Sequence, residues 1–309
     1  MGFSGEKRGG VAGALAAVDL GSSSFRLLRG QWQHGRFRET CDCSRHVGLA
    51  RCVDAAGQVT PDGREQVAAA LAELRPYVAD LPSARVAVAG TASLRSLDNG
   101  ADFCRFIEQM LGFPVRVIDG AEEARLTFAG AVGGTDAAAQ QGRHRVLDLG
   151  GASTELAAGA GGRPERTLSV PLGCATLGAL APADGADLEA LWRRVQQRLP
   201  AELSAFRAAD GGEVLAAPGI VGSMARLAGT PGRLDAAGLR RLGKLLAARG
   251  GATPLPDGVP AHHATLLPGA WAILGVLMEA LSASAVVEAG AGLRHGLVQE
   301  LVRRWPVAG

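Results

Sequence analysis

Short apolar runs open the chain, and turn residues separate them. The first three runs, at 14–20, 24–30 and 36–43, predict strands joined in consecutive hairpins. The spacing becomes helical after Thr60, which suits a helix N-cap, because Pro61 follows at the first helical position. The pattern next predicts a strand at 85–90, a helix at 100–111, a strand at 115–118 and an alanine-rich helix at 121–133.

The pattern then restarts. Residues 145–149 read RVLDL where residues 16–20 read AAVDL, and each run is followed by glycine, two small residues, a serine and another apolar strand. A recurrence of this kind indicates a duplicated domain. We expect an α/β protein with two domains, residues 1–130 and 131–309, divided near the glycine-rich connection at 133–135.

Helical patterns dominate the second half of the chain, with strands between them. The expected helices are 184–209, 222–228, 235–248, 262–282 and 292–304. The expected strands are 213–217 and 285–287.

Composition and charge exclude several classes of protein. The 309 residues are 47% hydrophobic and 20% charged, as in globular domains, and the formal net charge is +2. This balance argues against nucleic acid or an anionic membrane as the partner. The longest apolar stretch, 269–278, is shorter than the roughly 18 residues of a membrane span. Five irregularly spaced cysteines indicate free thiols in a cytoplasmic protein, and Cys41-x-Cys43 lacks the second pair that a zinc site needs.

The repeated Asp-x-Gly-x-x-Ser turn suits phosphate. Glycine lets the backbone approach a ligand closely, successive N–H groups make an anion-binding concavity, and the serine adds a donor. An aspartate at the strand end repels bare phosphate but accepts phosphate that arrives with Mg²⁺. One copy is weak evidence, because such turns are common in hairpins. Two copies predict two phosphate turns facing across one cleft, with Gly21 and Gly150 on opposite walls and Glu123 at the floor.

Further residues allow a functional and a structural interpretation. Glu122 and Glu123 open the helix at 121–133, where acidic residues also favour the helix dipole. Arg95 follows a strand and suits phosphate, although an isolated arginine is more often a surface salt-bridge partner. A third glycine-rich turn at 216–226 contains Ser223 and precedes a helix. His262-His263 could be metal ligands, but we interpret them as a helix cap or as surface packing, because adjacent histidines point apart and lack companions.

Seven segments, in order along nearly the whole chain, resemble the exopolyphosphatase/guanosine pentaphosphate phosphatase (Ppx/GppA) family. They are AAVDLGSSSFRLL (16–28), GTASLRSLDN (90–99), IDGAEEARLTFAG (118–130), RVLDLGGASTEL (145–156), SVPLGCATL (169–177), PGIVGSMARL (218–227) and GAGLRHGL (290–297). The resemblance implies two actin-like (ribonuclease H-like) domains with the active site between them. It also implies the short two-domain class, with the helix at 292–304 returning to the first domain.

The implied activity is hydrolysis of terminal phosphoryl groups from polyphosphate, of pppGpp to ppGpp, or of both. The resemblance makes Glu123 the residue that positions or deprotonates water, with Asp148 and Glu155 beside it as further catalytic acids. It implies Mg²⁺ or Mn²⁺ as the cofactor, held by Asp19, Asp148 and Glu155. The implied phosphate-binding residues are Gly21, Ser22, Ser23, Arg95, Gly150, Gly151, Ser153 and Ser223.

Some positions depart from the family pattern. The family usually has asparagine at Ser23, glycine at Ala152, threonine at Ser223 and arginine at His263. These departures leave open a weakly active or non-catalytic binder of polyphosphate or alarmone. An ATP-dependent kinase or ATPase of the same superfamily is the other alternative, and the oligomeric state, monomer or homodimer, is also left open.

Overall fold

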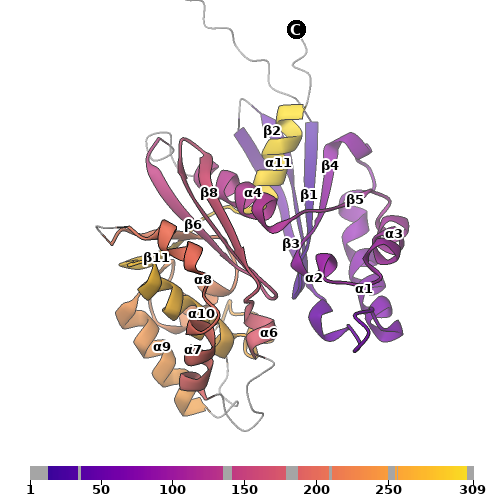
Figure 1. Cartoon of the computed structure of the whole chain (residues 1–309). Helices are drawn as coiled ribbons and strands as arrows, with labels where there is room; N and C mark the ends of the chain where they lie inside the picture. The colour runs from indigo at the N-terminus through magenta and orange to yellow at the C-terminus, as the bar shows by residue number, and fades with distance from the viewer. Residues whose placement is uncertain are drawn as a thin grey trace, which may run out of the picture.

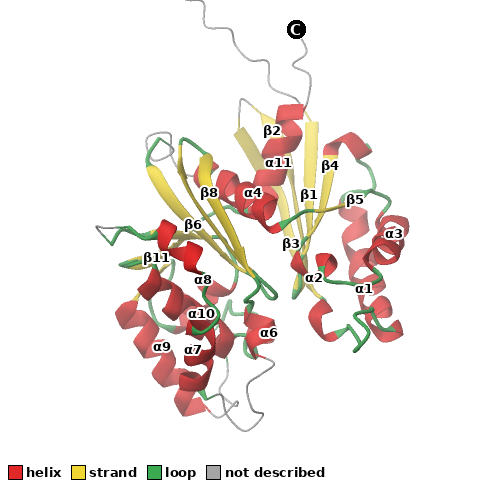
Figure 2. Ribbon diagram, in the orientation of Figure 1, coloured by secondary structure: helices red, strands yellow, loops and turns green. Residues whose placement is uncertain are grey.

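The structure, a computed structural model, describes residues 13–33, 36–134, 141–178, 187–208, 211–249, 255 and 257–304. Two mixed β-sheets stand side by side, and each has helices packed on it (Figures 1 and 2). Two further helices lie between the sheets. The chain is therefore an α/β protein built from two similar halves, as the recurring pattern predicts.

The first sheet has five strands in the order β3-β2-β1-β4-β5. Its strands are β1 (Gly13–Leu20), β2 (Ser24–Gln33), β3 (Arg36–His46), β4 (Val86–Gly90) and β5 (Val115–Val117). The first three strands are antiparallel hairpins, whereas β4 and β5 run parallel to β1. All five strands match the expected runs to within three residues.

One face of the first sheet is covered by α1 (Pro61–Leu74) and α3 (Gly100–Leu111). The α1 helix begins as expected, because the Thr60 hydroxyl accepts a hydrogen bond from the Gly63 N–H at 3.1 Å. Shorter turns complete this half: η1 (Leu49–Arg51), η2 (Arg75–Tyr77), η3 (Ser83–Arg85) and α2 (Ala92–Arg95).

The second sheet has six strands in the order β10-β11-β9-β6-β7-β8. Its strands are β6 (Arg143–Leu149), β7 (Thr154–Ala160), β8 (Arg163–Val170), β9 (Val214–Ala216), β10 (Arg233–Asp235) and β11 (Ala285–Glu288). The β6–β7 hairpin occupies the place that β1–β2 occupies in the first sheet. The pattern did not predict β8 or β10.

The second half is helical on one side of its sheet. Its helices are α6 (Cys174–Gly178), α7 (Leu188–Gln196), η4 (Ala201–Phe206), α8 (Ile220–Leu227), α9 (Ala236–Arg249), η5 (Ala261–His263) and α10 (Leu267–Ala280).

Two expected helices of this half differ from the structure. The expected helix at 184–209 is divided into α7 and η4, because Pro200 cannot continue an α-helix; residues 184–186 and 209 lie outside the described residues. The expected helix at 262–282 starts at Leu267, with Pro268 in its first turn.

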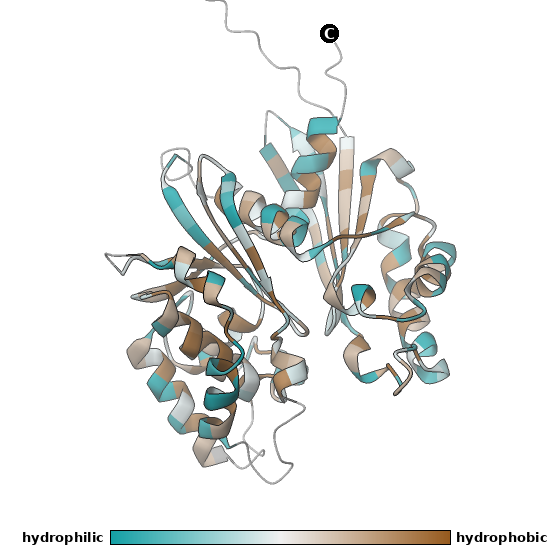
Figure 3. Ribbon diagram, viewed as in Figure 1, coloured by the Kyte–Doolittle hydropathy of each residue, from teal (hydrophilic) through white to brown (hydrophobic). Residues whose placement is uncertain are grey.

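The most apolar helix, α10, is buried along most of its length and is largely brown in Figure 3. It has 14 residues. Within the described ranges, every helix is too short or too polar to cross a bilayer.

Between the sheets, α4 (Gly120–Gly133) crosses α11 (Leu293–Arg304) (Figure 1). Phe128 of α4 packs on the second sheet, whereas Leu297 of α11 packs on the first. The crossing is tight: a Cβ on Gly130 would lie 2.0 Å from the Gly292 carbonyl oxygen, and one on Gly296 would lie 2.0 Å from the Leu126 carbonyl oxygen. The expected domain division at 130/131 falls inside α4 and stays a prediction.

Candidate functional site

The two repeated turns meet in space. The first turn follows β1, and the second follows β6, each at the tip of a hairpin. A Cβ on Gly151 would lie 3.0 Å from the Ser22 Cβ and 3.6 Å from the Ser23 nitrogen. The turns are therefore in contact, and both line a cleft of about 90 Å³ between the two halves.

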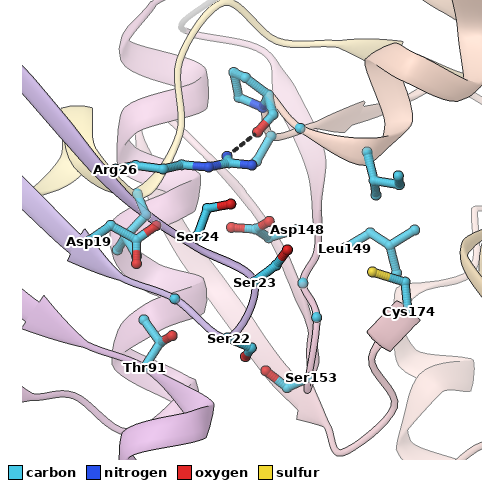
Figure 4. A pocket seen from close by; sticks show the side chains of 18 of the residues that line it. Asp19, Ser22, Ser23, Ser24, Arg26, Thr91, Asp148, Leu149, Ser153 and Cys174 are labelled. Carbon is cyan, nitrogen blue, oxygen red and sulfur yellow. Dashed lines mark hydrogen bonds between the residues drawn. The ribbon is translucent and has the colours of Figure 1, made fainter. Parts of the chain in front are cut away.

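Most of the expected site residues line this cleft. Those that do are Asp19, Gly21, Ser22, Ser23, Glu123, Asp148, Gly150, Gly151 and Ser153. Figure 4 shows Asp19 and Asp148 reaching into the space from different strands, and Ser22 lying close to Ser153. Glu155, Arg95 and Ser223 stand behind the lining rather than in it. The structure thus brings the two turns and three carboxylates to one place.

Two polar atoms of the lining have no partner among the residues that the structure describes. Asp19 Oδ1 and Ser23 Oγ are buried and make no hydrogen bond to any described residue. A buried polar group without a partner costs about 1–3 kcal/mol. Because both residues line the cleft, a ligand that hydrogen-bonds or coordinates them would recover that cost.

Glu123 is fixed by the start of α4. Asp119 caps this helix, because its Oδ1 accepts a hydrogen bond from the Glu122 N–H at 2.7 Å. Arg95 then donates from Nη1 to Glu123 Oε2 at 2.8 Å and to the Ile118 carbonyl oxygen at 2.7 Å. Arg95 therefore positions the carboxylate rather than contacting the cleft directly.

Asp148 and Glu155 are paired across the β6–β7 hairpin. Asp148 Oδ2 accepts from the Thr127 hydroxyl at 3.4 Å, and Glu155 Oε1 accepts from the Ser169 hydroxyl at 2.8 Å. Glu155 is almost fully buried, with 2% of its surface exposed. It does not line the cleft, but its charge contributes to the raised pKa of Glu123.

Burial and the neighbouring negative charges raise the pKa values of the carboxyl groups in and behind the cleft. Burial, and then the charge of Glu155, raises the pKa of Glu123 to about 9 against the opposing effect of Arg95. Burial and Asp148 raise the pKa of Glu155 to about 7, and burial raises the pKa of Asp19 to about 6. Burial raises the pKa of Asp148 as well. The cleft therefore has an excess of acid that favours a cation.

These residues suit a divalent cation that binds together with phosphate. Among the described residues, no three metal-binding side chains already converge on one point. Mg²⁺, however, typically takes one or two carboxylates and completes its shell with water and substrate phosphate. Asp19, with its unpartnered Oδ1, and Asp148 supply such carboxylates from opposite halves.

We expect cation binding to stabilise the protein more as pH rises. The raised pKa values mean that the folded protein holds these protons more tightly than the unfolded chain, whose acids titrate near pH 4. Their stabilising contribution is therefore complete below about pH 4, and it is lost as pH rises through about 6 to 9. A Mg²⁺ ion held by the ionised carboxylates would offset this loss.

Thermal unfolding with and without Mg²⁺ checks this expectation. The increase in Tm should be larger at about pH 8 than at about pH 5. Asp148→Asn should flatten the pH dependence. An increase that is equal at both pH values would show that these carboxylates do not bind the ion.

The interpretation of His263 as a helix cap or surface residue is wrong. His263 lies in η5, is 6% exposed and lines the cleft, because its ring packs inward against α8. The fully buried Ser223 hydroxyl lies 2.8 Å from His263 Nδ1. Ser223 therefore supports a cleft residue, although its position in a glycine-rich turn predicted direct phosphate binding.

Arg26 is a cleft residue that the sequence interpretation missed. It lies opposite Asp19 in the β1–β2 hairpin, and its Nη1 donates to the Pro218 carbonyl oxygen of the other half at 2.9 Å (Figure 4). Its charge lowers the pKa of both Asp19 and Asp148 and so opposes the effect of burial. Strand alternation offered a signal, because Ser24 and Arg26 share a face directly after the phosphate turn.

Known proteins resemble this chain in sequence. The sequence model of the Ppx/GppA phosphatase family matches residues 33–304. A guanosine-5'-triphosphate,3'-diphosphate pyrophosphatase of Vibrio cholerae is 28% identical over 296 residues, which are 93% of this chain and 59% of that protein. The chain thus spans under two thirds of that relative.

Solved structures share the fold. An exopolyphosphatase from Cytophaga hutchinsonii superposes with a TM-score of 0.82 at 19% identity, covering 96% of this chain and all of that one. The Aquifex aeolicus member of the Ppx/GppA family superposes with a TM-score of 0.72 at 20% identity, covering 94% of this chain and 98% of that one. These similarities show that the two halves are arranged as in those proteins.

Proposed function

The chain belongs to the Ppx/GppA phosphatase family, and we propose that it hydrolyses the terminal phosphoryl group of a phosphate chain in the cleft between its two halves. The substrate class is inorganic polyphosphate, pppGpp or both. The name of the relative from Vibrio cholerae supports pppGpp as a substrate. The similar structure from Cytophaga hutchinsonii is that of an exopolyphosphatase, which supports polyphosphate. The five cysteines are free thiols, which supports a cytoplasmic location.

The observation that carries the proposal is the meeting of two phosphate turns with unpartnered polar atoms. Gly21 and Gly150 line one cleft, and Asp19 Oδ1 and Ser23 Oγ in the same cleft lack partners among the described residues. Backbone N–H groups and hydroxyls of both turns can donate to phosphate oxygens. Glu123 lines the same space, so a water beside it would lie near the bound phosphoryl group.

The residues divide the chemistry between them. The turns bind and orient the terminal phosphoryl group, and Glu123, held by Arg95, orients the attacking water and accepts its proton at Oε1 or Oε2. Phosphoryl transfer depends mainly on positioning and on neutralising charge. We propose that Asp19 and Asp148, with Glu155 behind them, hold Mg²⁺ or Mn²⁺, which would neutralise phosphate charge when bound. Positive charge near these acids also favours the ionised form of Glu123 that can accept a proton.

Release of inorganic phosphate from three substrates tests the proposal. Polyphosphate, pppGpp and ATP should be assayed in parallel, with Mg²⁺, with Mn²⁺ and with a chelator. We expect phosphate from polyphosphate or pppGpp in the presence of metal, little from ATP and none with the chelator. Preferred hydrolysis of ATP would favour a kinase or ATPase, and binding of polyphosphate without hydrolysis would favour a non-catalytic binder.

A further inference from the structure

A second hollow, of about 530 Å³, lies on the first half of the molecule beside the cleft. Its walls come from the end of β3, from η1 and from α1. Its lining includes the polar residues Arg45, His46, Arg51, Gln66 and Glu73. The small side chains of Ala69 and Ala70 on α1 also line it. The functional site described above uses none of these residues.

The hollow shares a wall with the first phosphate turn. The N–H groups of Val47 and Gly48 donate to the Ser23 carbonyl oxygen at 2.9 and 2.8 Å, and both residues also line the second hollow. Ser23 lines the cleft on the other side of this wall. One short segment, 47–51, therefore separates the terminal phosphate position from the second hollow.

Histidines from both halves of the molecule connect the two spaces. His46, which lines the second hollow, stacks on His262 of the other half with ring centroids 4.2 Å apart. His262 in turn contacts His263, which lines the cleft, at 4.6 Å between centroids. Three contacting histidine rings therefore join the second hollow to the cleft.

The charge of the hollow suits an anion. The exposed Arg51 uses one N–H toward His46 Nε2, at 3.1 Å, and makes no ion pair with a described residue, so most of its five donors are available. Arg45 also faces the hollow, where it is paired with Glu73. Burial and Arg51 lower the pKa of His46, so its imidazole is neutral at neutral pH. Two guanidinium groups thus stand against one carboxylate, and Gln66 adds an amide donor.

We propose that this hollow, lined by Arg51 and Arg45, is a second phosphate subsite that binds phosphate groups beyond those held in the catalytic cleft. The inference rests on the proposed function, because it requires a substrate whose end is bound at the two turns. Arg51 is the main contact. Glu73 competes with phosphate for Arg45 and weakens the subsite.

Substrate length separates this subsite from the cleft. Arg51→Gln should raise KM for long-chain polyphosphate about tenfold and reduce the dependence of KM on salt, with kcat unchanged. Tripolyphosphate, which is too short to fill both spaces, should be hydrolysed with unchanged kinetics. Arg105→Gln, on the exposed face of α3, is the matched control and should leave KM and kcat unchanged for both substrates.

Glu73→Gln gives an effect of the opposite sign. The change removes the only carboxylate among the residues that line the hollow and releases Arg45, so KM for long-chain polyphosphate should fall about threefold. A purely structural role of the pocket predicts loss of binding in both variants. Opposite changes in KM, confined to the long substrate, support the subsite.

The outcomes distinguish the subsite from the proposed function. If the wild type releases no phosphate from any substrate, hydrolysis fails, and titration calorimetry with long-chain polyphosphate still tests the subsite through Arg51→Gln. Equal effects of Arg51→Gln on short and long substrates, or no effect on either, would overturn it. The same variants assayed with pppGpp show the source of the second phosphate group: a raised KM assigns the subsite to the 3'-diphosphate as well, and an unchanged one confines it to polyphosphate.

Discussion

Replacing Glu123 with glutamine should lower the rate of phosphate release by roughly 10²–10⁴, the range for a lost general base. The amide has the shape of the carboxyl group and can still accept the hydrogen bond from Arg95 Nη1, so the start of α4 should not move. Burial and Glu155 raise the pKa of Glu123 to about 9, and an amide resembles the protonated acid. Thermal stability should therefore be unchanged or slightly higher.

The adjacent glutamate supplies the control for this experiment. Glu122 points away from the cleft and pairs with Arg116 at 2.8 Å in a partly exposed ion pair. Such pairs contribute about 0–1 kcal/mol to stability, so Glu122→Gln should leave the rate within about a factor of two. The measurements are steady-state phosphate release and thermal unfolding of both variants. A larger loss from Glu122→Gln would show that the two adjacent residues have been assigned the wrong roles.

A single methyl group at Gly296 should destabilise the whole protein. In Gly296→Ala the new Cβ would lie 2.0 Å from the Leu126 carbonyl oxygen, where backbone faces backbone and no side chain can rotate away. The helices α4 and α11 must then separate, at a cost of about 3 kcal/mol, the upper range for overpacking. At 2–4 °C for each kcal/mol, Tm should fall by about 10 °C.

Gly290 provides the matched substitution in the same segment. A Cβ there meets no atom within 4 Å, and its backbone is not in the left-handed region, so Gly290→Ala should shift Tm by about 1 °C or less. Differential scanning calorimetry on both variants makes the comparison. Similar values of Tm would mean that the crossing adjusts without cost and that α4 and α11 are not tightly coupled.

The sequence predicts the elements whose pattern is local. The strands of the first sheet either alternate apolar and polar residues or are continuously apolar. Thr60-Pro61 marks the start of α1. The strand β8 was missed because Arg163, Glu165 and Arg166 make it look like a polar loop; pairing with β7 imposes its extended form. Pro200 and Pro268, by contrast, were available as signals for the helix boundaries in the second half.

In the candidate site, too, the residues of local motifs are predictable from sequence, and those that depend on distant partners are not. The turns after Asp19 and Asp148 are found from short motifs, and the structure places both in one cleft. The sequence does not show whether Arg95 and Ser223 contact the ligand or position another side chain, because each role depends on a partner far along the chain. Arg95 is bound to Glu123, and Ser223 to His263, 40 residues away. Only packing decides which of these side chains faces the ligand.

The place of α11 on the first sheet has a consequence for biosynthesis. Arg294 donates to the Leu27 carbonyl oxygen across 267 residues of sequence, and Leu293 and Leu297 cover Leu15 and Leu28. A ribosome that has made the whole first sheet has therefore not yet made the helix that covers one of its faces. Contacts over such separations form late, and exposed apolar strands aggregate. The nascent chain should consequently need a holding chaperone until α11 emerges, and the first half expressed alone should be insoluble.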